Sequence, residues 1–199
     1  MKVAIILNCG APIVRAIKAD KIICCDGGYK FCPIEPDIVL GDFDSLERSE
    51  VSAPVVEHDP HKNASDGELA VYYAKETYNA DEIVFYGVLG GRIDHVLCNF
   101  AIMKLASDLG ISAHAEEDGV NVYFAHGKFE LGVQRGDTVS ILPYGGNALV
   151  THSKDLEYPL NDLLLTPADS RGLSNVALSN RISVDIVSGN ALVFRYIKK

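Results

Sequence analysis

The chain has 199 residues, enough for one large domain or two small ones, and 48% of them are hydrophobic, enough to form a core. The formal net charge of −9 argues against nucleic acid as the main partner, because phosphate backbones require surfaces rich in Lys and Arg. A small nucleotide stays compatible with this charge, since a bound cation and a few nearby basic side chains can make the local charge positive.

The first residues predict a buried strand rather than an export signal. Their apolar run, Met1–Leu7, is short and ends at Asn8 without a small-residue cleavage site. No run in the chain approaches the roughly 20 apolar residues of a membrane helix. The cysteines are odd in number and form no C-x-x-C pair. We therefore expect a cytoplasmic protein with no zinc site and with reduced, mostly buried thiols at Cys9, Cys24, Cys25, Cys32 and Cys98.

The first part of the chain alternates short β-rich runs with helical patterns. The predicted strands are Val3–Leu7, Lys21–Cys25, Ile38–Leu40, Val55–Glu57 and Glu82–Tyr86. Several are apolar at successive positions, as expected for strands that are buried on both faces. The predicted helices are Ala11–Lys18, Asp66–Tyr78 and Val96–Leu109. This alternation predicts a mostly parallel, Rossmann-like sheet with helices on both faces.

Local signals delimit two of these helices. Ser65 followed by Glu68 fits a capping box at the start of the helix that begins with Asp66. Gly110 is a C-terminal stop signal for the helix that begins at Val96.

After about Asn121 the pattern changes to short strands separated by Gly, Pro, Asn and Asp. The predicted strands are Asn121–Ala125, Thr138–Pro143, Ala148–Thr151, Ile182–Val187 and Ala191–Ile197, with hairpin turns at Tyr144–Asn147 and Val187–Ala191. Regularly spaced short strands of this kind predict an all-β antiparallel sandwich. We therefore expect an α/β domain over residues 1–118 and a β-sandwich domain over residues 119–199.

Carboxylates stand where strands end or helices begin. Asp42 and Asp44 lie two residues apart after Gly41, which frees the backbone for a tight turn, and an extended backbone would place both side chains on one side. Asp66 opens a helix, and Lys62 lies nearby, where a phosphate would satisfy both the Lys and the helix N-terminus. Carboxylates gathered at one sheet edge repel one another unless a cation lies between them, which favours Mg²⁺ and a phosphorylated substrate.

Two glycine pairs lie at similar positions. Gly90 and Gly91 lie between a strand and a helix, where backbone N–H groups can approach phosphate oxygens and Arg92 can add a bidentate contact. In the same segment Asp94 could be a metal ligand or a helix cap. His95 could donate a hydrogen bond to phosphate, act as a proton shuttle or form a structural hydrogen bond. The second pair follows Asp26 at the end of a strand.

Each feature has a structural explanation as well. A D-x-D-S loop is a common helix N-cap, an Asp in a first helical turn is favoured by the helix dipole, and Asp26-Gly27-Gly28 fits a simple turn. A Walker loop is absent, and no G-x-G-x-x-G follows the first strand, which disfavours a dinucleotide oxidoreductase.

Five motifs in this order resemble the thiamine pyrophosphokinase family over nearly the whole chain. They are Asp26-Gly27-Gly28, Gly41–Ser45, Lys62–Asp66, Gly90–His95 and Gly172–Asn175. The resemblance implies an ATP- and Mg²⁺-binding catalytic domain followed by a thiamine-binding and dimerisation domain. It also implies a homodimer with shared active sites.

The resemblance also implies roles for individual residues. Metal binding falls to Asp26, Asp42, Asp44 and Asp66, and catalysis to Asp42, Asp44, Asp66, Asp94 and Lys62. The ATP-binding set is Asn8, Asp26, Gly27, Gly28, Lys62, Gly90, Gly91, Arg92 and His95. Thiamine contacts fall to Ser174 and Asn175.

The chain departs from the family pattern at three points. Asn63 and Ser65 stand where the family often has Asp and Thr, which leaves the number of metal ions open. Some family members stack thiamine on a C-terminal Trp, and this chain has none; Phe194 or Tyr196 can take that place, and we select Phe194.

The expected reaction is attack of the thiamine hydroxyl on the β-phosphorus of ATP, which releases AMP. Either Asp66 or Asp94 would accept the hydroxyl proton. The alternatives are a diphosphotransferase for another primary alcohol such as a hydroxymethyl-pterin, a non-catalytic nucleotide or thiamine binder, and a metal-dependent phosphohydrolase.

Overall fold

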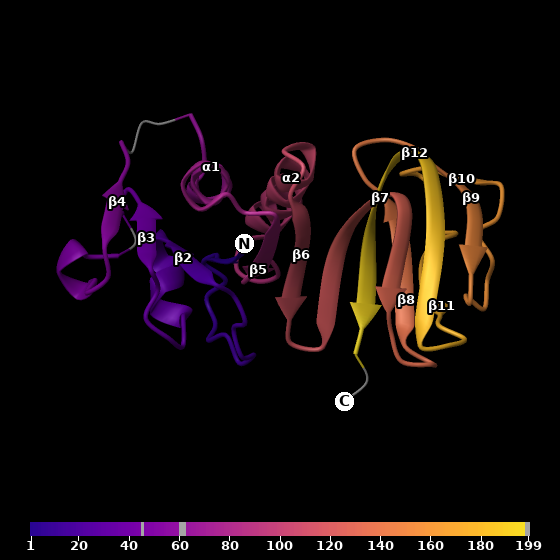
Figure 1. The fold of residues 1–199 in the computed structure, drawn as a ribbon, viewed down its shortest axis with the longest axis horizontal. Coiled ribbons are helices and arrows are strands. Elements are labelled where there is room, and N and C mark those ends of the chain that lie inside the picture. Colours follow the sequence, from indigo (N-terminus) through magenta and orange to yellow (C-terminus); the bar gives the residue numbers. More distant parts are fainter. Residues whose placement is uncertain (45, 60–62, 198–199) are drawn as a thin grey trace. The chain divides into compact units, whose positions relative to one another are not determined.

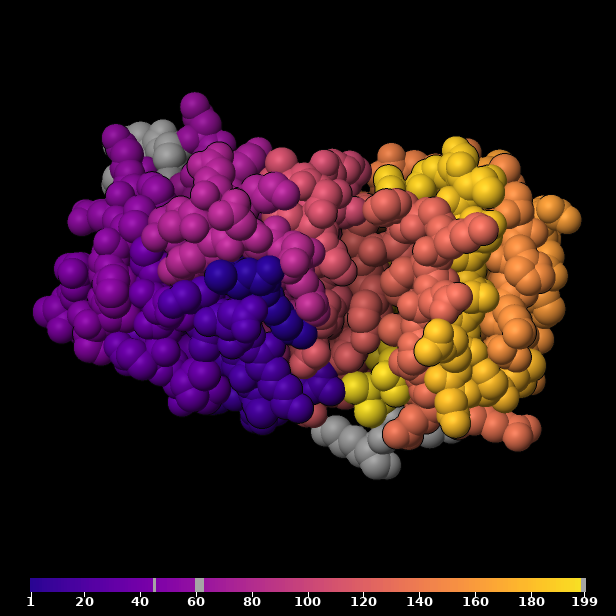
Figure 2. Space-filling view, viewed as in Figure 1, coloured from indigo at the N-terminus to yellow at the C-terminus, as the bar shows by residue number. Residues whose placement is uncertain are grey.

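The computed structural model describes residues 1–44, 46–59 and 63–197. The chain forms a sheet-rich α/β fold with two compact units, Met1–Asp118 and Gly119–Lys199. Figure 1 colours the first unit from indigo to rose and the second from rose to yellow, and Figure 2 shows the surfaces of both in the same colours. Within the described part of the chain, no helix is long and apolar enough to cross a membrane.

The first unit contains a sheet of six strands in the order β6-β5-β1-β2-β3-β4, and all its strand pairs are parallel. The strands are β1 (Lys2–Ile6), β2 (Lys21–Cys25), β3 (Ile38–Gly41), β4 (Val55–Glu57), β5 (Glu82–Tyr86) and β6 (Ser112–Glu117). The five predicted strands are confirmed. The sequence does not signal β6, because only the small residues Ala113 and Ala115 mark its buried side.

The helices α1 (Asp66–Tyr78) and α2 (Ile93–Asp108) contact each other on one face of this sheet (Figure 1). The predicted bounds of α1 are confirmed, and its N-cap is Ser65, whose Oγ accepts a hydrogen bond from the Glu68 N–H at 3.2 Å. Helix α2 begins three residues earlier than predicted, directly after Arg92. The Gly90–His95 motif therefore runs into the first turn of α2.

In the described part of the chain, irregular segments and a short 3₁₀ helix, rather than α-helices, pack on the other face of the sheet, so the prediction of helices on both faces is wrong. The segment predicted as the helix Ala11–Lys18 is not helical. Its Ile13 and Ile17 pack against buried Ile6 and Cys24 in one cluster. A spacing of four residues between apolar side chains thus reflects loop packing here, and Pro12 and Gly10 disfavour a helix.

Two short 3₁₀ helices complete the first unit, η1 (Asp26–Phe31) and η2 (Arg48–Glu50). The cysteines, all free thiols, are less buried than expected. Only Cys24 and Cys25 are buried, whereas Cys98 is exposed and Cys9 and Cys32 are intermediate.

The second unit is antiparallel throughout its strand pairs. Strands β7 (Val120–Gly132) and β12 (Arg181–Tyr196) pair from end to end, with one interruption between Ile186 and Ala191. The other edge of β12 pairs first with β9 (Ala148–Lys154) and then with β8 (Thr138–Pro143). Strand β10 (Leu163–Leu165) pairs with β9, and β11 (Asn175–Val176) pairs with β8. Residues of β8, β9 and β12 contribute to one core, which includes Ile141, Val150, Ile182 and Val193.

Both predicted hairpins in this unit are wrong. The segment Val187–Ala191 lies inside the single strand β12, where the pairing with β7 shifts between Ile186 and Ala191. The segment Tyr144–Asn147 joins β8 to β9, which both pair with β12 rather than with each other. The turn residues in β12 therefore mark an irregularity of the kind that β-bulges produce. It lies where the other edge of β12 changes its partner from β9 to β8.

Candidate active site

The carboxyl ends of the parallel strands meet at one edge of the sheet in the first unit, and a cavity of about 450 Å³ lies there. Ligands bind at this edge in open α/β sheets. The lining residues come from the ends of β1, β2 and β3 and from the starts of α1 and α2. They are Leu7, Asn8, Cys25, Asp26, Asp42, Asp44, Ser65, Asp66, Gly67, Arg92, His95, Cys98, Asn99 and Ile102.

Asp26 is the buried carboxylate among these lining residues, with 6% of its surface exposed. It begins η1 directly after β2 and has a φ of 40°, a backbone conformation that costs energy in a residue with a Cβ atom. Gly41, at the end of β3, accommodates it, because a Cβ at position 41 would lie 2.8 Å from the Asp26 Cβ. Gly41 itself lies in β3 and provides room for Asp26, and the turn follows at Phe43.

Asp42 and Asp44 lie together, although not on an extended backbone. Phe43 between them has a φ of 59°, and the Asp44 N–H donates to Asp42 Oδ1 at 3.3 Å. This turn replaces the predicted extended segment. Oxygen atoms of Asp26, Asp42 and Asp44 all lie within 4.8 Å of one another.

Three carboxylates at this separation fit a hard divalent cation, which prefers several oxygen ligands and offsets their mutual repulsion. Among the described residues, this is the group of acidic, His or Cys side chains with metal-binding geometry. The predicted fourth ligand, Asp66, lines the same cavity as the first residue of α1 but lies outside this group.

Arg92 and His95 line the cavity from the start of α2, whereas Asp94 does not. The Arg92 guanidinium holds Asp94 through two hydrogen bonds, from Nε to Oδ1 at 3.1 Å and from Nη2 to Oδ2 at 2.5 Å. Arg92 lowers the pKa of the Asp94 carboxyl, and Asp94 raises the pKa of Arg92. Because Asp94 also lies outside the carboxylate group, its contact is with the cation of Arg92 rather than with a metal site.

The four predicted phosphate-binding glycines do not line the cavity. Gly27 and Gly28 are buried inside η1. Gly90 and Gly91 lie in an exposed loop with φ values of 140° and 63°. Lys62, the remaining predicted ATP ligand, lies outside the described residues, as does Ser45 of the Gly41–Ser45 motif.

Sequence reasoning missed several lining residues, among them Cys25, Cys98 and Asn99. Asn99 and Ile102 follow Arg92 and His95 at helical spacing, so the period of α2 extended from Arg92 would have found them. Cys25 has no helical signal of this kind; it lies at the end of β2, directly before Asp26 in the sequence.

The predicted thiamine-binding residues lie in the second unit. Ser174 is exposed with a φ of 55°, and its N–H donates to Ser140 Oγ at 3.0 Å. Asn175 is buried, and its amide accepts from the Tyr158 N–H at 3.0 Å and donates to the Tyr158 carbonyl at 2.7 Å. Its side chain therefore holds the Tyr158 backbone. Phe194 is partly buried on β12.

Two family models, one for each domain of thiamin pyrophosphokinase, match the two parts of the chain. Residues 15–112 match the model described as thiamin pyrophosphokinase, catalytic domain, and residues 128–191 match the model described as thiamin pyrophosphokinase, vitamin B1 binding domain. A thiamine pyrophosphokinase of Bacillus subtilis is 25% identical over 171 residues, which cover 81% of this chain and 79% of that protein.

Solved structures share the fold. The crystal structure of thiamine pyrophosphokinase from Bacillus subtilis aligns with a TM-score of 0.85 at 21% identity, over 100% of both chains. Thiamin pyrophosphokinase from Candida albicans aligns with a TM-score of 0.80 at 13% identity, over 99% of this chain and 90% of that one.

Proposed function

The chain belongs to the thiamin pyrophosphokinase family, and we propose that it transfers a diphosphate group from ATP to the hydroxyl of thiamine, with thiamine diphosphate and AMP as products. The observation that carries the proposal is the group of Asp26, Asp42 and Asp44 in a cavity within the part of the chain that matches the catalytic model. Carboxylates beside a polyphosphate require a cation, which a diphosphotransferase also needs.

The residues that would hold Mg²⁺ are Asp26, Asp42 and Asp44, with Asp66 facing the same cavity. Bound there, the ion supplies positive charge that offsets the charge on phosphate oxygens. The fixed turn at Phe43 and the room left by Gly41 keep the three carboxylates in place, so little reorganisation is needed when substrate binds.

In this proposal the nucleotide is bound by Asn8, Arg92 and His95, which line the cavity, together with Lys62. The loop with Gly90 and Gly91 leads directly into Arg92. Arg92 is already oriented by its two bonds to Asp94, which supports a bidentate contact with the transferred group. Asp66 rather than Asp94 accepts the hydroxyl proton of the acceptor, because Asp66 lines the cavity and Asp94 does not.

The second unit binds thiamine and forms a homodimer in this proposal, which is supported by the vitamin B1 binding model over residues 128–191. Ser174 and Phe194 contact thiamine, while Asn175 shapes the site through the Tyr158 backbone. The parallel order of β1 to β6 supports the description of the first unit as Rossmann-like, and the shared core of β7 to β12 supports that of the second as a β-sandwich. We place the protein in the cytoplasm, without a membrane or nucleic-acid partner.

The test is to incubate the purified protein with ATP, Mg²⁺ and thiamine, and to quantify AMP and thiamine diphosphate. We expect equal amounts of both products, and neither product when thiamine is omitted. Phosphate or pyrophosphate release without thiamine would identify a phosphohydrolase instead. If AMP forms only with another primary alcohol, the protein is a diphosphotransferase whose acceptor is not thiamine.

A further inference from the structure

The loop between β5 and α2 leads from the sheet into the cavity. It spans residues 87–92, and its three glycines, Gly87, Gly90 and Gly91, have φ values of 77°, 140° and 63°. It ends at Arg92, which lines the cavity, and α2 follows with His95 and Asn99. Because glycines have little preference for one backbone conformation, contacts from outside the loop must decide where it lies.

Glu117, the last residue of β6, provides such contacts. Its Oε1 accepts hydrogen bonds from the N–H groups of Val88 at 2.5 Å and Leu89 at 3.4 Å. Burial raises the pKa of this carboxyl, although the backbone N–H groups of Val88, Leu89 and Gly87 act in the opposite direction. The carboxylate thus gives up much of its hydration to hold the loop.

Val88 is also held by Asn99, through its carbonyl rather than its N–H. The Asn99 Nδ2 donates to the Val88 carbonyl at 3.0 Å, and Asn99 itself lines the cavity. Both backbone polar groups of Val88 are therefore bound by side chains from different elements, while its own side chain is fully buried. Fixing one residue from both directions defines the path of the segment that follows it.

We propose that Glu117 is a positioning residue for the ATP site, which acts together with Asn99 by clamping Val88 so that the Gly90–Arg92 segment meets the polyphosphate in one conformation. Glu117 does not line the cavity, so its effect reaches the nucleotide through the loop. This inference rests on the proposed function, because it assigns the cavity to ATP.

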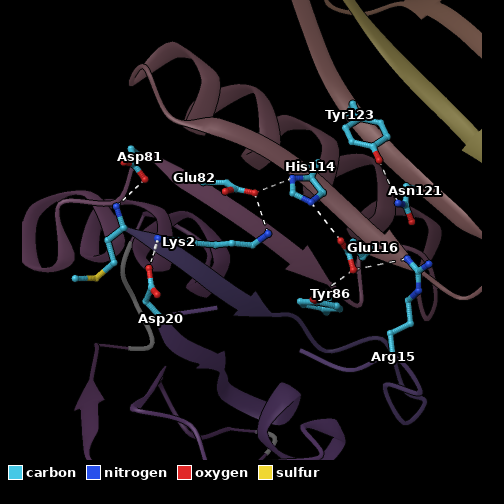
Figure 3. A network of polar contacts seen from close by, with 11 residues as sticks. Lys2, Arg15, Asp20, Asp81, Glu82, Tyr86, His114, Glu116, Asn121 and Tyr123 are labelled. Carbon is cyan, nitrogen blue, oxygen red and sulfur yellow. Dashed lines mark hydrogen bonds and ion pairs between the residues drawn. The ribbon is translucent and has the colours of Figure 1, made fainter. Parts of the chain in front are cut away.

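The neighbouring Glu116 provides a matched control. Successive residues of a strand point to opposite faces, and Glu116 contacts His114 Nε2 at 3.5 Å and Arg15 Nη1 at 3.8 Å, as Figure 3 shows. It bonds none of the loop residues that Glu117 holds. A substitution at position 116 thus changes the same strand and the same kind of side chain without releasing Val88.

The experiment compares MgATP binding by the full-length wild type and three variants, measured by calorimetric titration without thiamine. Glu117→Asp keeps the charge but shortens the side chain, and we expect the Kd for MgATP to rise about tenfold or more, as displacement of a positioned group does. Glu117→Gln keeps the length and an acceptor oxygen, and should stay within about threefold of the wild type. Glu116→Asp should stay within about twofold.

A second readout separates positioning from a general loss of stability. In Glu117→Asp, amide exchange at Val88 and Leu89 should become faster, and the KM for thiamine should not change. A Glu117→Asp protein that binds MgATP as tightly as the wild type would overturn the clamp, as would an equal loss in Glu116→Asp. A wild-type protein that binds no MgATP would instead overturn the assignment of the cavity to ATP, before any variant is compared.

Discussion

Asp42 shows at the scale of one residue how charge, rather than bulk, defines the site. It lies in a turn beside Asp44, and both face the buried Asp26 within 4.8 Å. An amide has almost the same shape as the carboxylate but carries no negative charge. Substitution by Asn therefore separates the electrostatic role of the residue from its part in the fold.

We expect Asp42→Asn to lower diphosphate transfer by at least about 10²-fold, because loss of a metal ligand removes several kcal/mol of charge stabilisation. The measurement is thiamine diphosphate formation at saturating Mg²⁺, with circular dichroism to confirm the fold. Asp108→Asn is the control, since that carboxylate forms only an exposed ion pair with Lys104 in the described structure. Full activity in Asp42→Asn would refute the metal assignment.

Glu116 illustrates a residue that contributes to stability outside the cavity. A hydrogen bond from His114 lowers the pKa of its carboxyl, with further support from Arg15 and Lys2, against the opposing effect of burial (Figure 3). A lowered pKa means that the folded protein binds this proton less readily than the unfolded chain. Glu116 therefore stabilises the fold above its unfolded pKa of about 4.3, and this contribution disappears as the pH falls through the lower folded pKa.

We predict that Glu116→Gln lowers the free energy of unfolding at pH 7, and that its difference from the wild type shrinks as the pH falls below about 4.3. Urea unfolding of both proteins across this range measures the difference. A difference that stays constant with pH would show that packing, not charge, accounts for the role of Glu116.

At the scale of elements, segments far apart in the sequence hold each other through close backbone contacts. The segment that contains Gly172 runs along β8, where the Ile141 N–H donates to the Gly172 carbonyl at 2.8 Å and Asn175 pairs with Val139. A Cβ at position 172 would lie 1.8 Å from the Ile141 carbonyl oxygen. This approach explains the glycine of the Gly172–Asn175 motif by packing.

Gly172→Ala should therefore lower the free energy of unfolding by about 3 kcal/mol or more, because backbone must move to relieve the overlap. Chemical denaturation provides the value. Gly132→Ala is the control, since a Cβ there meets nothing within 4 Å, and its effect should be much smaller. Equal effects of the two substitutions would contradict the packing explanation.

At the scale of the whole molecule, each unit has its own core, and the surface of the second unit carries large exposed apolar side chains. Tyr158, Leu164, Leu173 and Leu178 are exposed by 60%, 45%, 54% and 47%. Exposed apolar side chains favour association where they form a contiguous patch. The proposed homodimer would cover part of this surface.

We expect light scattering after size-exclusion chromatography to give twice the chain mass of 21.6 kDa at the concentration of the activity assay. If dilution lowers the mass to that of one chain, activity should fall at the same concentration, because the proposal shares active sites between subunits. A fully active species with the mass of one chain would rule the shared sites out.

The sequence by itself determined the elements with strong local signals and the family. The strands with uninterrupted apolar runs, such as Lys21–Cys25, are confirmed, as are the bounds and N-cap of α1 at Ser65. Those signals act between neighbouring residues, so a linear pattern contains them. The order of the five motifs is also a linear property, and it indicated the family that the two models match.

Only the tertiary structure decided which side chains meet. The separation of Asp66 from the group of Asp26, Asp42 and Asp44, the room that Gly41 leaves for Asp26, and the bonds from Glu117 to Val88 all involve residues on different strands, helices or loops. The union of two predicted strands into β12 likewise depends on pairing with β7. These features arise from chain segments that contact each other only after folding, and their spacing along the sequence therefore contains no direct record of them.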